Sequence, residues 1–134
     1  MDETMTTAVE IIETQELIKN GTLTAPDDFL DTPISVLLEV CNGCGAAGAK
    51  FDFIPDTLWG LCICAVCHIH DFEYHHGATE EDRDRADDRF LMNGINLIET
   101  KSGNWFSRIA RNYRMTSYYT AVAEAGAKAF WVGK

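Results

Sequence analysis

A very short link between two long predicted helices constrains the fold of this 134-residue chain more than any other feature. The first predicted helix covers residues 61–76 and ends at Gly77. The second begins at Thr79, where Asp82 three residues later completes a capping box, and it continues to about Lys101. Because only one or two residues separate them, the two helices are predicted to lie antiparallel and side by side.

One further helix is predicted near each end of the chain. Residues 4–20 carry a stripe at helical spacing and stop at Gly21; the stripe consists of Ala8, Ile11, Ile12, Gln15 and Ile18. Residues 105–126 also carry one, formed by Trp105, Ile109, Asn112 or Tyr113, Thr116, Tyr119 and Val122. Phe130 and Trp131 are predicted core anchors, and the apolar run 33–38 is too short to assign. With 46% hydrophobic and 24% charged residues, the sequence predicts one mainly α domain over residues 1–134.

The formal net charge of −10 is unevenly distributed. Residues 1–100 hold 20 of the 21 acidic side chains and 5 of the 11 Lys and Arg, whereas residues 101–134 hold one acid and six bases. So acidic a chain is not expected to bind nucleic acid. Two interpretations of the basic segment remain open, namely packing of the last helix beside an acidic helix and a binding surface for anionic head groups.

No sequence signal directs the chain to a membrane or to export. The N-terminal sequence MDETMTTAVE is acidic and lacks the cationic start and apolar run of a secretory signal. No stretch reaches the roughly 18 apolar residues of a membrane span. The chain is therefore expected to be cytoplasmic.

The antiparallel pair brings a histidine and an aspartate together. Cys67, His70 and Tyr74 share one face of the 61–76 helix. On the following helix, the apolar stripe extends one turn toward the N-terminus onto Asp87; its apolar members are Phe90, Leu91, Gly94, Leu97 and Ile98. His70 and Asp87 lie about equally far from the turn, so they are predicted to meet. A histidine held by a buried carboxylate can act as a general base on water, and Tyr74 can donate to the same carboxylate.

Asp71 lies on the adjoining face of the same helix and has a different role available. Residues 41–48, CNGCGAAG, form a glycine- and alanine-rich loop that can offer backbone carbonyls. A carboxylate beside such carbonyls is the ligand set of a hard cation such as calcium.

Three motifs resemble the phospholipase A2-like superfamily. Residues 67–74, CHIHDFEY, resemble the C-x-x-H-D-x-x-Y helix of secreted-type phospholipases A2. Residues 86–90, ADDRF, are similar to the A-D-x-x-F of the phospholipase domain in parvovirus capsid proteins and to the D-x-x-F of small bacterial and fungal phospholipases. Residues 44–48, CGAAG, resemble the C-G-x-G-G calcium loop, with Ala47 where the family prefers glycine. The resemblance covers about residues 41–98 and is nearest to small phage or prophage-encoded members.

The resemblance implies a fold with two antiparallel site helices, supporting N- and C-terminal helices and a Gly-rich calcium loop. It implies that His70 is the base, Asp87 its partner and Tyr74 the donor to that partner. It also implies a calcium site made by the Asp71 side chain and the carbonyls of Gly43, Gly45 and Ala47, with the Gly45 amide in the oxyanion hole. The implied activity is calcium-dependent hydrolysis of glycerophospholipid esters.

The implied partner is a phospholipid or a membrane surface, and a phage origin would place the protein in the host-cell cytoplasm or the virion. Arg108, Arg111 and Arg114 are candidate contacts for lipid phosphates. The alternative is that these arginines pair with acids of the 79–101 helix.

The cysteines allow a competing metal site. Cys41, Cys44, Cys64 and Cys67 have the C-x2-C-x19-C-x2-C spacing of a four-cysteine zinc site. The phospholipase resemblance instead implies a disulfide between Cys44 and Cys67. Cys62 and Cys64 are otherwise expected to be buried free thiols. His68, His75 and His76 are candidate metal ligands, although solvent-facing positions are expected for them.

A second functional class therefore stays open beside the hydrolase. On the same scaffold, a non-catalytic phage-type binding or structural protein, stapled by zinc or a disulfide, would engage a protein partner through its acidic face.

Overall fold

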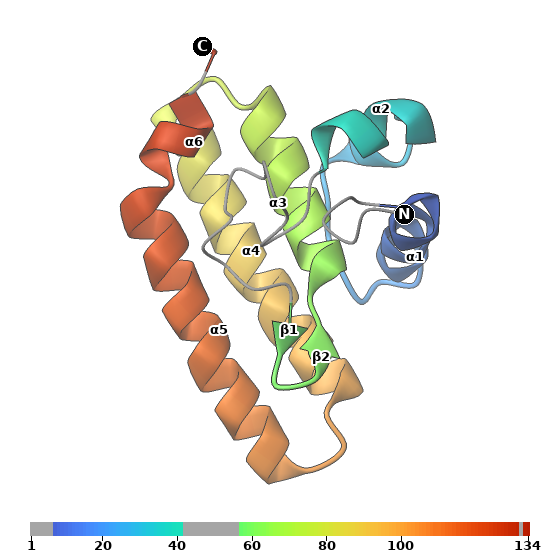
Figure 1. Ribbon diagram of the computed structural model, residues 1–134, viewed down its shortest axis with the longest axis vertical. Helices are drawn as coiled ribbons and strands as arrows, with labels where there is room; N and C mark the ends of the chain where they lie inside the picture. The colour runs from blue at the N-terminus through green and yellow to red at the C-terminus, as the bar shows by residue number, and fades with distance from the viewer. Residues whose placement is uncertain (1–6, 42–56, 132) are drawn as a thin grey trace.

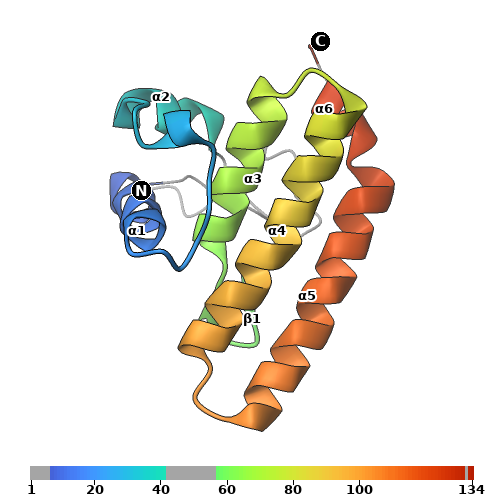
Figure 2. The same cartoon turned by 180° about the vertical axis from the view of Figure 1, so that it is seen from behind.

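The computed structural model describes residues 7–41, 57–131 and 133–134, and these are mainly helical. Three long helices lie side by side, with α4 (Glu80–Lys101) between α3 (Cys64–His76) and α5 (Trp105–Ala125) in both views (Figures 1 and 2). The shorter helices α1 (Ala8–Lys19) and α2 (Ile34–Val40) lie against the other side of α3. The predicted mainly α class is confirmed.

The α3–α4 pair has the predicted antiparallel arrangement. Both halves of the capping box are present, because the Thr79 hydroxyl accepts from the Asp82 amide and the Asp82 carboxylate accepts from the Thr79 amide, each at 3.1 Å. The apolar stripe of α4 faces the core, where Phe90, Leu97 and Ile98 are at most 3% exposed. The link is confined by α6 (Ala127–Trp131), since a Cβ atom on Gly77 would lie 2.6 Å from the Phe130 ring.

A small antiparallel hairpin precedes α3, where the sequence predicted helix. Strand β1 (Thr57–Leu58) pairs with β2 (Leu61–Cys62), so the helix begins at Cys64 rather than at residue 61. The turn between the strands requires left-handed backbone at Trp59 (φ 45°) and Gly60 (φ 86°). These two positive φ values direct residues 61–62 back along β1, so the helix begins three residues later than predicted.

The predicted stripe of α1 is only partly correct. Ile11 and Thr14 are fully buried, while Leu17 and Ile18 pack partly buried against the core. Ile12 is 45% exposed and Ala8 is also exposed. The buried face is therefore centred on Ile11 and Thr14, because the hydroxyl of Thr14 is satisfied there by the Glu10 carbonyl at 2.9 Å.

The buried face of α5 shares only Val122 with the predicted one. Met115, Tyr118 and Val122 face the core. Trp105, Ile109 and Tyr113 face solvent and are 57–78% exposed. Met115 lies in the core because Gly94 of α4 has no side chain and lets the two helices approach closely. A Cβ atom on Gly94 would lie 2.5 Å from the Met115 side chain. Phe130 is fully buried as predicted, but Trp131 is 38% exposed and is not a core anchor.

The basic last helix packs beside an acidic one, as one of the two charge interpretations predicted. Arg108 of α5 lies 3.5 Å from Glu99 of α4, and Tyr119 donates to Asp88 at 3.2 Å. No helix within the described residues is both long enough and apolar enough to cross a membrane.

Candidate active site

Three side chains predicted from spacing meet between α3 and α4. The Asp87 Oδ1 atom lies 2.9 Å from His70 Nε2 and accepts from the Tyr74 hydroxyl at 2.6 Å. The three residues are buried, with exposed fractions of 0–4%. One turn of α3 separates His70 from Tyr74, so one oxygen of Asp87 can receive both donors.

The hydrogen-bond network assigns the tautomer of His70. A carboxylate can only accept, so Nε2 carries the hydrogen that His70 donates to Asp87. In the neutral ring, Nδ1 is then the nitrogen with the lone pair that can accept a proton. Burial, followed by the hydrogen bond to Asp87, raises the pKa of the Tyr74 hydroxyl well above its usual range, so Tyr74 stays protonated and remains a donor.

Aromatic side chains hold the two donors in place. The His70 ring lies 4.2 Å from the Tyr74 ring and 4.9 Å from the Phe90 ring, measured between centroids. On its other side, Tyr74 contacts the edge of Phe130 at 5.1 Å. The sequence predicted Phe90 and Phe130 as core residues; it carried no signal that either would contact the site, since that depends on how α4 and α6 dock.

Asp71 is also buried, at 2% exposure. Its charge, after burial itself, helps to raise the pKa of the Cys41 thiol far above its usual range. The Cys41 thiol is free and donates to the His68 carbonyl at 3.3 Å. The other predicted calcium ligands, Gly43, Gly45 and Ala47, lie outside the described residues, and so does the predicted oxyanion donor.

The cysteines at the start of α3 differ from both predicted arrangements. Cys62 and Cys64 form a disulfide, and Cys62 is exposed, so the expectation of two buried free thiols is wrong. Cys67 is 1% exposed and disulfide-bonded, while its predicted partner Cys44 lies outside the described residues. A disulfide sulfur is not a thiolate ligand, so the predicted zinc set would require Cys64 in its reduced form. No cluster of three or more His, Cys, Asp or Glu side chains that could hold a metal occurs within residues 7–41 and 57–134, Val132 aside.

The remaining histidines divide into two environments. His75 and His76 are exposed, as expected. His68 is fully buried instead, and its Nδ1 atom lies 2.8 Å from the Thr14 hydroxyl. Burial lowers the pKa of His68 to about 4, so its ring is neutral near pH 7.

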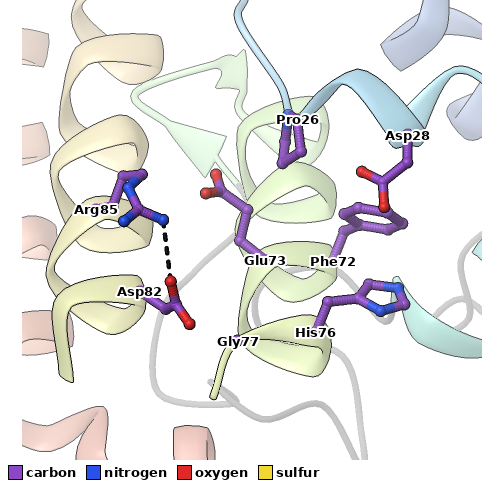
Figure 3. Close-up of a pocket in the computed structure, with 8 residues that line it drawn as sticks. All are labelled: Pro26, Asp28, Phe72, Glu73, His76, Gly77, Asp82 and Arg85. Carbon is purple, nitrogen blue, oxygen red and sulfur yellow. Dashed lines mark hydrogen bonds and ion pairs between the residues drawn. The ribbon is translucent and has the colours of Figure 1, made fainter. Parts of the chain in front are cut away.

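A cavity of about 220 Å³ lies near the α3–α4 turn; of the residues singled out from the sequence as possible ligands or catalytic groups, it is lined by His76 alone among those the structure describes. Figure 3 shows its charged lining from α3, α4 and the segment before α2, with Arg85 of α4 bonded to Asp82 at 3.0 Å. Glu73 also lines this cavity. It forms an ion pair with Arg89 at 3.2 Å, although the geometry is not that of a hydrogen bond. Burial raises the pKa of Glu73 to about 7, although Arg89 and Arg85 oppose that shift. These acids have cationic neighbours, and the cavity is separate from the His70 site.

The three predicted lipid-contact arginines have different surroundings. Arg108 pairs with Glu99, as the alternative prediction had it. Arg111 donates to the Ser102 hydroxyl at 3.0 Å and to the Trp59 carbonyl at 3.1 Å. Arg114 is exposed.

Comparison of the chain with known proteins identified no relative that could be set beside this site. No protein-family model matches the chain, and neither a curated protein nor a solved structure matches it.

Proposed function

We propose that this protein is a calcium-dependent, phospholipase A2-like hydrolase of glycerophospholipid esters. The observation that carries the proposal is the buried contact of His70 Nε2 with Asp87, reinforced on the same oxygen by Tyr74. Burying a carboxylate or an imidazole costs several kcal/mol unless it is paired, and here each is buried together with its partner. Paired titratable groups of this kind gather at reactive sites.

In the proposed reaction, His70 Nδ1 takes a proton from water as the water oxygen attacks the ester carbonyl. The carboxylate of Asp87 orients the ring and stabilises the imidazolium that forms. Tyr74 fixes the position of Asp87, and the packed rings of Phe90 and Phe130 keep bulk water away from the polar cluster. His70 then returns the proton to the leaving alcohol oxygen.

Asp71 fits the proposed cation. Its buried carboxylate supplies a hard oxygen ligand one residue from His70, and its negative charge already acts on the neighbouring Cys41 thiol. Together with the carbonyls of residues 43, 45 and 47, it would hold calcium, which when bound polarises the ester carbonyl and stabilises the oxyanion.

The test is hydrolysis of a phosphatidylcholine substrate by the purified chain, with calcium and with a chelator. We expect release of fatty acid that requires calcium and that Asp71→Asn greatly reduces. Hydrolysis that continues undiminished in chelator and in Asp71→Asn would contradict the calcium assignment. A folded protein that releases no fatty acid with calcium present would contradict the proposal as a whole.

One observation favours the non-catalytic alternative. An apolar groove of about 470 Å³ lies between α1 and the start of α3, and acidic side chains border it; its lining includes Ile12, Leu17, Leu61, Ala65, Leu97, Glu10, Glu13 and Glu16. Such a groove suits a basic, apolar segment of a protein partner. Elemental analysis separates the candidates, because one zinc per chain without hydrolysis supports the binding protein, whereas calcium-dependent hydrolysis without tightly bound zinc supports the enzyme.

A further inference from the structure

The outer face of α5 is apolar over the first half of the helix. Trp105, Phe106, Ile109 and Tyr113 are 65%, 67%, 57% and 78% exposed. At about 100° per residue these four side chains fall within an arc of about 100°, opposite the buried positions 115, 118 and 122. The arc lies opposite Met115, which packs against Gly94 of α4, and α5 is the outermost of the three long helices (Figures 1 and 2). Large exposed apolar side chains gathered on one face mark a contact surface.

Arginines border this arc on both sides. By helical spacing, Arg108 lies about 60° beyond one edge of the arc and Arg114 about 80° beyond the other. Both are exposed, and Arg108 lies 3.5 Å from Glu99 of α4. Between Glu99 and Glu124 the sequence contains no acidic residue. The aromatic face is therefore flanked by two arginines, of which Arg108 is paired with Glu99.

The acidic part of α4 lies at the far end of this face. α4 and α5 are antiparallel, so the acid-rich first turns of α4 lie beside the last turns of α5. Two contacts fix this register: the Arg83 guanidinium donates to the Ala123 carbonyl at 2.7 Å, and Tyr119 donates to Asp88. The first half of α5 thus presents a cationic, aromatic surface although the whole chain carries a net charge of −10.

The hairpin adds a further aromatic side chain next to this helix. Arg111 of α5 holds the turn through its 3.1 Å bond to the Trp59 carbonyl, and the Tyr118 hydroxyl holds the strand through the Thr57 carbonyl at 3.1 Å. Trp59 is 60% exposed. Trp59 is thus exposed beside the first half of α5, on the side of the helix that carries Arg111.

We propose that this face, formed by Trp105, Phe106, Ile109 and Tyr113 with Arg108 and Arg114, docks the protein on the surface of an anionic phospholipid bilayer. Tryptophan and tyrosine rings suit the boundary between head groups and acyl chains, and flanking arginines pair with lipid phosphates. A two-fold pair of α5 helices would instead set the arginines of two copies against each other. This docking goes beyond the proposed hydrolysis and requires neither turnover nor calcium.

The test is co-sedimentation of the full chain with ether-linked vesicles in the presence of a chelator, so that no ester can be cut. Vesicles of phosphatidylcholine alone are compared with vesicles that also contain phosphatidylserine. We expect binding to the anionic vesicles, and a loss of about tenfold in the double variant Trp105→Ala, Phe106→Ala. Arg114→Gln should weaken binding to anionic vesicles by about fivefold, and Arg108→Gln should weaken it less because Arg108 already pairs with Glu99.

The control is Val9→Ala, which removes an apolar side chain of α1 that is 64% exposed. It should bind as the unaltered chain does. The proposal is overturned if the unaltered chain does not bind anionic vesicles, or if the α1 control loses as much binding as the α5 variant. It is also overturned if light scattering shows a dimer that the α5 variant dissociates while vesicle binding is unchanged. Because ether-linked lipids contain no ester to hydrolyse, this binding measurement tests the docking surface even if the protein proves not to be a hydrolase.

Discussion

The centre and the edge of this molecule invert the usual distribution of polarity. Between α3 and α4 the fold buries His70, Asp71 and Asp87, each at most 4% exposed. On α5 it exposes Trp105 and Tyr113 by 65% and 78%. Both choices cost stability, the first through lost hydration and the second through apolar surface left in water. A buried polar cluster and an exposed apolar face each lower the stability of the fold, so these two regions are the ones to test for function.

The largest expected effect concerns the buried pair. Asp87→Asn removes the carboxylate that assigns the tautomer of His70, so we expect the rate of phospholipid hydrolysis to fall by about a thousandfold or more. Tyr74→Phe leaves the carboxylate and removes one donor, so a fall of only about tenfold is expected. Equal losses in the two variants would contradict the separate roles of carboxylate and phenol.

The next effect compares a central phenylalanine with a peripheral one. Phe90 is 2% exposed and contacts the His70 ring, so Phe90→Ala should lower the free energy of unfolding by about 3–5 kcal/mol. Phe106 is 67% exposed, so Phe106→Ala should change it by no more than about 0.5 kcal/mol. Urea unfolding of both variants measures the difference, and a large loss in Phe106→Ala would show that the outer face of α5 is covered in solution.

A smaller effect comes from two buried groups whose titrations oppose each other. His68 has its pKa lowered from 6.5 to about 4, so the unfolded chain binds the extra proton and stability falls as the pH drops through that window. Glu73 has its pKa raised from 4.5 to about 7, so the folded chain binds the extra proton and stability falls as the pH rises through that window. The two contributions largely cancel between about pH 4.5 and 6.5.

Single variants should uncover each contribution. With His68→Gln we expect a chain that becomes more stable as the pH falls from about 6.5 to about 4.5, and with Glu73→Gln one that becomes less stable. Each change should amount to no more than about 3 kcal/mol in the free energy of unfolding. Parallel pH profiles for the two variants would contradict the assignment of opposite signs.

The smallest effect tests the link between α3 and α4. Gly77→Ala would place a Cβ atom 2.6 Å from the Phe130 ring, so we expect a loss of about 1–2 kcal/mol as α6 is displaced. Gly103→Ala is the control, because nothing lies within 4 Å of a Cβ atom there. Thermal unfolding of the two variants provides the comparison. Equal melting temperatures would show that α6 moves to admit the Cβ atom without any loss of stability.

The sequence was sufficient for the central pair because a short link leaves little freedom. With Gly77 and Thr79 marking the two helix ends, the distances of His70 and Asp87 from the turn predicted their contact. The outer face of α5 could not be predicted in this way. That helix carries apolar side chains on two opposite sides, one with Trp105 and Ile109 and one with Met115 and Val122. The close approach of Met115 to Gly94 decides which side is buried. That contact depends on how α4 and α5 pack, which the sequence of α5 alone does not specify.

His68 and Cys62 show the same limit. Nothing in the local pattern of α3 distinguishes a buried histidine from an exposed one, because the burial of His68 depends on Thr14 from a different helix. The pairing of Cys62 with Cys64 depends on the hairpin, because Cys62 lies in strand β2 and the helix begins only at Cys64. The sequence therefore predicted the His70–Asp87 contact across a short link, but it did not predict contacts that depend on how separate elements pack.

The most direct test of the central claim is the calcium-dependent hydrolysis of phospholipid by His70→Gln beside His76→Gln. His70 contacts Asp87 inside the fold, while His76 lies on the same helix and is exposed. We predict that His70→Gln stays folded and loses hydrolysis, whereas His76→Gln hydrolyses at the rate of the unaltered chain. Retention of the full rate by a folded His70→Gln protein would contradict the assignment of His70 as the general base.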